Sequence, residues 1–477
     1  MTGSSVMDEF SSLLDVAGSY CKSRAANLVK NHIFASLMGP YSSTISNFIC
    51  VNGRSDKDWS AEYRLYSKER VDADSFYNTS LNEICNALPD GEPIVFGVDD
   101  TLSRKTGRKI DGVAWRRDPL GPAFRTNLVR GQRFLMFSAA WKIGNGEAQM
   151  LPVYFEHAPT ATRPSSKATE EELAEWRKEK KRMSLGTRAV AGFDKISNSL
   201  PERKIIAVGD GGYTTGFILK NMPSGISYIG RMRKDAKLFY PPSEHHVTKN
   251  GRPRSYGDRA PTPEELRQND SILCKEVEAV ASGRRHTFRV KEIKNLLWRP
   301  AGAKISVRVI VIAPTGYRLR KGSKLLYRQP AYLLCTDDNL PIEEVLQYYL
   351  WRWGVEVNFR DVKELIGVGD AMVRTEPSNR ILPAVLVGGY SLLWIAALKM
   401  MSKEVNPVSR LVAPKWRAEL EANRTKPSTG QLLRQIRAEC LSEAIESYTF
   451  DGFVSGKVMD TKPKKLGIKL RGIIQTA

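Results

Sequence analysis

The segment "YLWRWGVEVNFRDVKELIG" (residues 349–367) restricts the fold more than any other part of the chain. On a helix with about 100° per residue, Tyr349, Arg352, Glu356 and Lys363 fall on a stripe about 60° wide. Hydrophobic side chains flank this stripe on both sides, whereas a solvent-facing helix normally leaves one whole side polar. The pattern therefore predicts one helix, embedded in the protein, that presents four polar groups along a line.

The glutamate on this helix requires either neighbouring cations or a metal ion. Arg352 and Lys363 can form an ion-pair network with Glu356, and the sequence leaves that alternative open. Two apolar strands also end in aspartate, "IVFGVDD" and "IIAVGD". Because ligands of α/β sheets gather at the carboxyl ends of strands, we expect Asp100 and Asp210 to lie close together.

Three carboxylates in one place favour hard divalent cations. Asp100, Asp210 and Glu356 supply the oxygen ligands that Mg²⁺ prefers. Two such ions, about 3.5–4 Å apart, promote phosphodiester chemistry by activating one oxygen and stabilising the other. We therefore predict that these three residues are catalytic and bind two Mg²⁺ ions, for which Mn²⁺ can substitute. Asp99 remains the alternative to Asp100.

The charge of the chain agrees with a phosphodiester substrate. Lys and Arg number 73 against 52 Asp and Glu, giving a net charge of +21 and a pI near 9.6. A soluble protein this basic usually binds a polyanion, most often a nucleic acid. A basic protein without such a partner is the alternative, and charge alone does not separate DNA from RNA.

Changes in hydrophobic pattern divide the chain into several regions. Helical spacing predicts helices in the first region, which we expect from its position and charge to bind DNA. Alternating strands and helices then indicate an α/β domain with a mixed sheet. The predicted regions are 1–90 (helical, N-terminal), 91–233 (first part of the catalytic core), 234–338 (β-rich insertion), 339–403 (second part of the core) and 404–477 (basic, C-terminal).

Membrane and disulfide signals are weak. The apolar run at 380–401 contains Gly388 and Gly389, so we interpret it as a buried helix, with a membrane span as the alternative. The first residues, "MTGSSVMDEFSSLL", lack the pattern of a secretory signal. Six cysteines are scattered with no C-x-x-C pair, which is typical of a reducing cytoplasm. We expect a cytoplasmic protein with no membrane partner.

The embedded helix also resembles a known family. Its pattern Tyr349-x2-Arg352-x3-Glu356-x6-Lys363 is similar to the Y-R-E-K signature of bacterial cut-and-paste insertion-sequence transposases. "VDDT" resembles the first-aspartate motif of these DDE enzymes, and "GDGGY" resembles the second. The resemblance covers about residues 92–370. It implies an α/β fold in which a ribonuclease-H-like catalytic core carries an inserted β-rich subdomain, with helical N-terminal and C-terminal regions.

The resemblance also implies roles for individual residues. The three carboxylates would bind the metals, and Tyr349, Arg352 and Lys363 would hold phosphates near the cleaved transposon end. In the family, a Trp on the last strand of the insertion stacks on a flipped base. Tyr332 stands at that position here and Trp298 is a second candidate, with core packing as the alternative for both. The remaining residues that resemble DNA contacts of the family are Arg231 and Arg233.

We therefore expect a DDE transposase, a metal-dependent DNA endonuclease and strand transferase. It would cleave element ends at terminal inverted repeats and join the 3′-hydroxyl ends to target DNA. The family implies a homodimer on two paired ends of double-stranded DNA, in the bacterial cytoplasm and associated with the nucleoid. Two other classes stay open: a ribonuclease-H-like metal-dependent nuclease without strand transfer, and a domesticated, non-catalytic DNA-binding protein.

Overall fold

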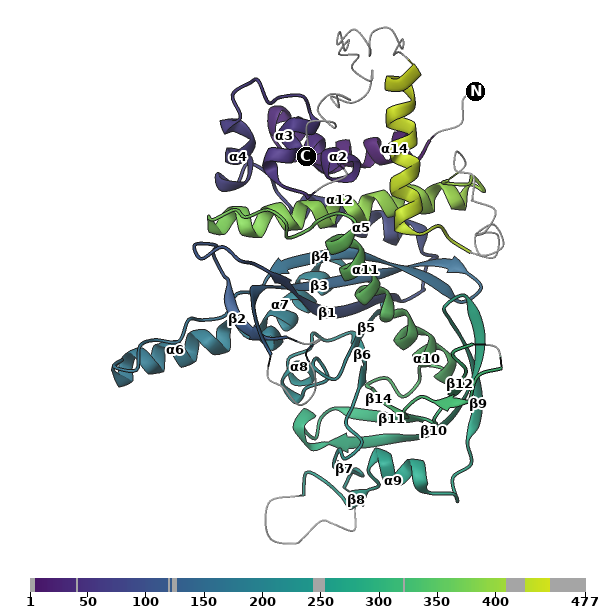
Figure 1. Ribbon diagram of the computed structural model, residues 1–477. Coiled ribbons are helices and arrows are strands. Elements are labelled where there is room, and N and C mark those ends of the chain that lie inside the picture. The colour runs from purple at the N-terminus through teal and green to yellow at the C-terminus, as the bar shows by residue number, and fades with distance from the viewer. Residues whose placement is uncertain are drawn as a thin grey trace.

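The chain has a mixed α/β fold built on one large sheet (Figure 1). The computed structural model describes residues 5–39, 42–118, 121, 127–242, 254–320, 322–408 and 425–446. Much of the expected basic C-terminal region, namely 409–424 and 447–477, lies outside the described residues.

The strands that position the site lie at the centre of the sheet. β1 (Ile94–Arg104), β3 (Leu128–Gly144) and β4 (Glu147–His157) pair antiparallel, and β5 (Ile205–Gly209) and β6 (Ile226–Arg231) run parallel to β1. Their spatial order is β4-β3-β1-β5-β6. β5 and the first half of β1 are buried along their length, which is typical of central parallel strands. This arrangement is compatible with the expected ribonuclease-H-like core.

Most strands of residues 234–338 continue this sheet. β14 (Ala331–Cys335) pairs with β6, and β11 (Ser306–Ile312) and β10 (Arg284–Trp298) follow in order. A separate β-rich subdomain is therefore not confirmed, because these strands share one hydrogen-bonded sheet with the core. The shorter elements outside this series, together with the strands at the sheet edges, are β2 (Ala114–Arg117), β7 (Leu238–Phe239), β8 (Arg259–Ala260), β9 (Lys275–Ala281), β12 (Gly316–Tyr317), β13 (Leu326–Tyr327), α9 (Pro263–Gln268) and the 3-10 turn Arg299–Ala301. Of these, β12 and β13 form a separate two-stranded sheet.

Helices between β4 and β6 cover one face of the sheet and extend beyond it. α7 (Leu185–Ser199) packs on β3, where the rings of Phe137 and Phe193 meet edge to face at 5.0 Å. α6 (Glu170–Arg182) has no buried residue and projects away from the body (Figure 1). The short α8 (Gly216–Lys220) follows β5.

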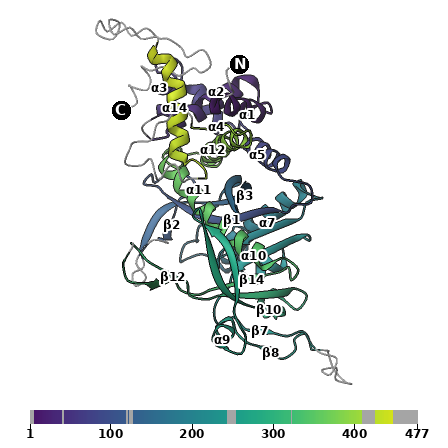
Figure 2. The same ribbon diagram turned by 90° about the vertical axis from the view of Figure 1, so that its right-hand side faces the viewer.

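A helical layer surrounds one long apolar helix, α12 (Glu376–Ser402) (Figure 2). Its length and hydropathy would suffice to cross a membrane, but its apolar window is wholly buried inside the protein. Gly388 and Gly389 allow this packing, since a Cβ there would lie 2.7 Å from Phe76 and Ile33. The other helices of the layer are α1 (Val6–Gly18), α2 (Ser23–Met38), α3 (Ile45–Val51), α4 (Ser60–Ser67), α5 (Asp74–Ala87) and α14 (Thr429–Glu446).

The segment predicted as one helix forms two. α10 (Ile342–Trp351) and α11 (Trp353–Glu364) meet at Arg352, where the Val355 amide donates to the Arg352 carbonyl at 2.9 Å. The start of α11 lies tightly against β4, because a Cβ on Gly354 would lie 2.5 Å from Met150 Cγ. The prediction of one continuous helix was therefore wrong at Arg352, which is also a predicted site residue.

A buried amide joins α11 to the sheet and to α12. The Asn358 side chain is fully buried and donates to the Ser138 hydroxyl at 3.2 Å and to the Met150 carbonyl at 2.9 Å. The Tyr390 hydroxyl donates to its oxygen at 3.1 Å. Satisfied buried polar groups of this kind fix one arrangement of the elements that they connect.

We expect Asn358→Leu to lower the free energy of unfolding by about 2–4 kcal/mol, because it leaves several buried polar groups without partners. Urea unfolding would measure the loss. Glu364→Gln, an exposed position on the same helix, is the matched control and should change stability by less than about 0.5 kcal/mol. Equal stability of the Asn358 variant and the control would contradict this role.

Candidate active site

The site begins where α11 packs on β1. A Cβ on Gly97 would lie 2.7 Å from Val355 Cγ2 and 3.8 Å from Arg352 Cα, so this glycine allows the helix to approach the strand. Side chains two residues apart on a strand share a face. Asp99 therefore faces α11, on the same side of the sheet as Glu356.

Arg352 connects the two carboxylates directly. Its Nη1 lies 3.2 Å from Asp99 Oδ2 and its Nη2 lies 2.8 Å from Glu356 Oε1. The Arg352 side chain is 11% exposed, and its guanidinium lies over the Tyr349 ring at 5.8 Å. The break between α10 and α11 thus places a largely buried cation between two acids.

Asp210 follows β5 directly and lies next to β1. Val98 pairs with Gly209 at the end of the parallel ladder, so Asp99 of β1 and Asp210 directly after β5 lie next to each other in register. Asp210 Oδ1 accepts hydrogen bonds from the Gly212 amide at 2.8 Å and the Tyr213 amide at 3.2 Å. The "GDGGY" loop therefore orients this carboxylate with its own backbone.

The electrostatics of Asp99 reflect these neighbours. Burial, and after it the charge of Asp210, raise the pKa of Asp99 to about 7, although the Asp100 amide and Arg352 act in the opposite direction. When two carboxylates lie close together without a cation between them, the negative charge of one disfavours ionisation of the other. A proton or a cation at Asp99 relieves this repulsion.

Asp100 points to the other face of β1. It accepts a hydrogen bond from the Tyr213 hydroxyl at 2.9 Å and forms an ion pair with Arg133 at 3.3 Å. Burial raises the pKa of Asp100, and Arg133 opposes that rise. The structure therefore does not bring the predicted Asp100 to Glu356. It brings Asp99, the alternative that the sequence left open.

The predicted DNA-binding residues fall into different environments. Burial raises the pKa of Tyr349, while Arg352 and the exposed Arg231 lower it, which places Arg231 within electrostatic reach of the site. Lys363, on α11, is half-buried and burial lowers its pKa. Arg233 is 85% exposed and pairs with Asp235 at 2.9 Å.

The predicted stacking residue is not on the surface. Tyr332 is 6% exposed and its hydroxyl donates to Glu264, and Trp298 packs against the core. The core-packing alternative therefore describes both rings. An exposed aromatic on the site helix was missed: Trp353 follows Arg352 and is 62% exposed. Its place in "WRWGVE" carried no sign of exposure, because the predicted wheel put it on an apolar flank.

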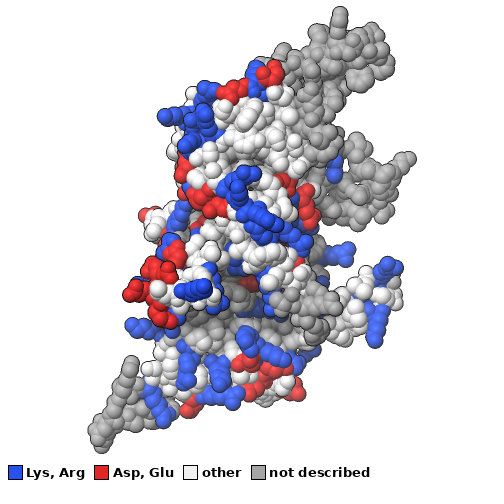
Figure 3. Space-filling model, turned by 60° about the vertical axis from the view of Figure 1, so that its left-hand side comes forward, with Lys and Arg blue, Asp and Glu red and all other residues white. Residues whose placement is uncertain are grey.

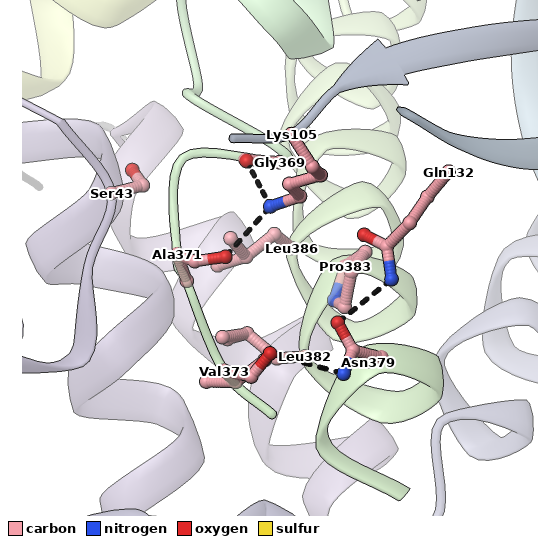
Figure 4. Close-up of a pocket in the computed structure, with 10 residues that line it drawn as sticks. All are labelled: Ser43, Lys105, Gln132, Gly369, Ala371, Val373, Asn379, Leu382, Pro383 and Leu386. Atoms are coloured by element: carbon pink, nitrogen blue, oxygen red, sulfur yellow. Dashed lines mark hydrogen bonds between the residues drawn. The ribbon is translucent and has the colours of Figure 1, made fainter. Parts of the chain in front are cut away.

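Hydrogen bonds from Lys105 fix the segment that follows α11 (Figure 4). Lys105, just beyond β1, donates to the carbonyl of Gly369 and to that of Ala371 at 2.7 Å. The Ser43 amide donates to Asp370 at 3.0 Å from the helical layer. Burial lowers the pKa of Lys105 to about 8. The strand that carries Asp99 thus contacts α11 before the acids, at Gly97, and contacts the segment after α11 beyond them, through Lys105.

The donor set suits a hard cation, although the carboxylates are not gathered around one point. Within the described ranges, no group of three or more His, Cys, Asp or Glu side chains is arranged to hold a metal ion. Asp99 and Asp210 nevertheless offer oxygen ligands beside each other, and their repulsion favours a cation. Glu356 can join them only after Arg352 releases it, because the guanidinium now stands between the acids.

Comparison with known proteins gives one family. Residues 51–299 match the model of the family described as DDE superfamily endonuclease. The matched range contains Asp99, Asp100 and Asp210 and ends before Glu356. No curated protein matches the chain.

The raised pKa of Asp99 predicts a specific pH dependence in metal-free protein. The folded state binds the Asp99 proton more tightly than the unfolded chain, so this residue reduces stability as pH rises from about 4 to about 7. Asp99→Asn should therefore raise the free energy of unfolding by up to about 4 kcal/mol at pH 8, and by little at pH 4.5.

Urea unfolding in EDTA at the two pH values would measure the difference. Asp194→Asn, at an exposed position on α7, is the matched control and should shift neither value. A variant at position 99 that is no more stable than wild type at pH 8 would contradict the electrostatic account.

Proposed function

The chain belongs to the DDE superfamily endonucleases, and from this premise we propose that it is a DNA transposase. In this proposal it cleaves the element at its terminal inverted repeats and joins the freed 3′-hydroxyl ends to target DNA. The observation that carries the proposal is the Asp99–Arg352–Glu356 arrangement beside Asp210, because it unites the acids and a phosphate-binding cation. The net charge of +21 supports DNA as the substrate.

Members of this family generally act with divalent metal ions, and we propose that Asp99, Asp210 and Glu356 hold two Mg²⁺ ions, replaceable by Mn²⁺. Such ions supply activation of the attacking oxygen and charge stabilisation at the leaving oxygen. Oxygen donors of these types favour both ions. Asp99 takes the place of Asp100 in this assignment, since Asp99 faces α11.

The other side chains of the site then position DNA. Arg352 neutralises Asp99 and Glu356 in the metal-free protein, and its fork of N–H donors suits a phosphate once other cations neutralise them. Tyr349 lies under the Arg352 guanidinium, and the charge of Arg231 acts on Tyr349. A phosphate beside Arg352 would therefore have several hydrogen-bond donors nearby. Lys363 extends the positive charge along α11. The exposed ring of Trp353 offers a stacking surface for an unpaired base.

Asp100 has a supporting role in this proposal. Through the Tyr213 hydroxyl it holds the loop whose amides orient Asp210. Its own contacts lie on the face away from Glu356, so it positions a ligand without being one.

Cleavage by matched variants tests the proposal. We expect Asp99→Asn and Glu356→Gln to slow cleavage by about 10²-fold or more, because each removes a ligand that supplies several kcal/mol to the transition state. Asp100→Asn should slow it by about tenfold or less. The measurement is excision, with Mg²⁺, from a plasmid that carries the gene's native flanking DNA.

The controls separate chemistry from binding and from other functions. All three variants should bind flanking DNA in EDTA within about threefold of wild type. A larger loss from Asp100→Asn than from Asp99→Asn would restore Asp100 as the ligand. Cutting without joining would indicate a nuclease, and wild-type cleavage equal to that of Glu356→Gln would remove Glu356 from the chemistry.

A homodimer on two ends belongs to the same proposal, and a paired-end complex in sedimentation would support it.

A further inference from the structure

Beyond Asp99, β1 continues into a basic ribbon formed with β2 and β3. The ribbon surface comprises Arg108 and Lys109 in the β1–β2 connection, and Trp115, Arg117 and Arg130 on the two strands. All except Arg130 are exposed, and Trp115 is 67% exposed. None of these residues belongs to the site described above.

The ribbon carries uncompensated positive charge. Among its described residues between 102 and 130, seven are Lys or Arg and two are Asp. One of these acids, Asp118, pairs with Arg104 at 2.8 Å. Arg108, Lys109 and Arg117 form no side-chain ion pair within the described part of the chain. An ordinary solvated face mixes both signs of charge, and α6 does so through its Glu–Arg and Glu–Lys pairs.

The ribbon surface lies on the same face of the sheet as Asp99. Ser103, four residues after Asp99, pairs with Gln132 of β3. Arg130 is two residues from Gln132 and pairs with Trp115 of β2. Because paired residues and residues two apart share a face, Trp115, Arg117 and Arg130 extend the face that carries Asp99. Between Asp99 and the ribbon, this face is covered at Ser103 by Gly369 and at the buried Gln132 by Asn379, so the ribbon forms a separate exposed surface beyond that cover.

One cation of the surface is held in place by the backbone. Arg130 donates to the carbonyls of Thr106 and Arg108, both at 3.2 Å. These bonds fix the β1–β2 connection against β3, so Arg108 and Lys109 project from a braced turn. A braced cationic surface loses less conformational entropy on binding than free side chains do. In Figure 3, Lys and Arg side chains border the hollow across the middle of one face.

We propose that the ribbon surface binds double-stranded DNA beside the active site. Arg108, Lys109 and Arg117 contact phosphates, and the Trp115 indole packs against the sugar-phosphate wall of the groove. The charge and the exposed aromatic ring among arginines select a nucleic acid over an acidic protein. This inference rests on the proposed function only in that DNA is the substrate at Asp99.

The salt dependence of DNA binding tests the surface. The test variant combines Arg108→Gln, Lys109→Gln and Arg117→Gln, and the probe is a fluorescent random-sequence 40-bp duplex in EDTA. Losing three phosphate contacts should reduce the slope of log K against log[KCl] by about 2–3, since each contact contributes about 0.9. Fluorescence anisotropy between 50 and 300 mM KCl gives the slope.

The chain offers a control with the same loss of charge. Lys142 and Lys204 lie beside the amino-terminal end of β1, and Lys195 lies on α7. They pair with Glu92, Asp337 and Asp74, respectively. The combined Lys142→Gln, Lys195→Gln and Lys204→Gln variant should change the slope by less than about 1, because these lysines lie away from the ribbon. An equal change in both triple variants would overturn the proposal, since it would reflect net charge alone.

A second variant separates the aromatic contact from charge. Trp115→Ala should weaken binding about fivefold or more at one salt concentration, because burying part of the indole against the duplex is worth about 1 kcal/mol or more at roughly 25 cal/mol per Å², and it should leave the slope unchanged. Both readouts come from intact protein, with thermal unfolding as the check on folding. Wild-type affinity and slope in both ribbon variants would overturn the proposal. Binding is measured without metal, so a loss of slope in a chain that never cuts DNA would support the surface and refute the transposase.

Discussion

The contact between α11 and β1 at Gly97 is the constraint on which the site depends. A Cβ at position 97 would lie 2.7 Å from Val355 Cγ2, so glycine lets the helix pack closer to the strand than a larger residue would. Once the two elements touch, the alternation of the strand decides that Asp99 and not Asp100 faces Glu356. The Asn358 bonds to Ser138 and Met150 then fix the rotation of α11. The geometry of the site therefore follows from the packing of Gly97 against Val355, which lie two residues before Asp99 and one residue before Glu356, respectively.

The sequence predicted the elements of the site better than their junctions. The strand-terminal aspartates and the polar stripe with Glu356 were recognisable, because apolar runs and helical spacing are local signals. The break at Arg352 was not, since residues 349–363 keep helical periodicity through it. The sequence also does not show that strand β14 of the expected insertion pairs with β6, because hydrogen bonding between distant strands leaves no local pattern. Tyr332 occupies the position of the base-stacking Trp of the family, but it is buried and its ring is not accessible to a base.

The choice between Asp99 and Asp100 shows what kind of information was missing. Both follow an apolar strand, and adjacent residues on a strand point to opposite faces. The sequence cannot state which face a distant helix covers, but it held a usable signal. Gly97 interrupts an otherwise bulky strand two residues before Asp99, and an isolated glycine in a strand marks close approach of another backbone. Reading that glycine as a contact would have favoured Asp99.

β1 also explains why a strongly basic chain carries buried acids. Asp99 and Asp100 leave their strand on opposite faces, where Arg352 and Arg133 each neutralise one of them. Past these acids the same strand enters a ribbon whose cations have few acidic partners. Along β1, the two acids therefore lie near the contact with α11, and Lys and Arg outnumber Asp in the ribbon beyond them. In the function proposed above, cations of the ribbon attract DNA to the side of the sheet on which Asp99 lies, because one strand carries both the acids and the start of the ribbon.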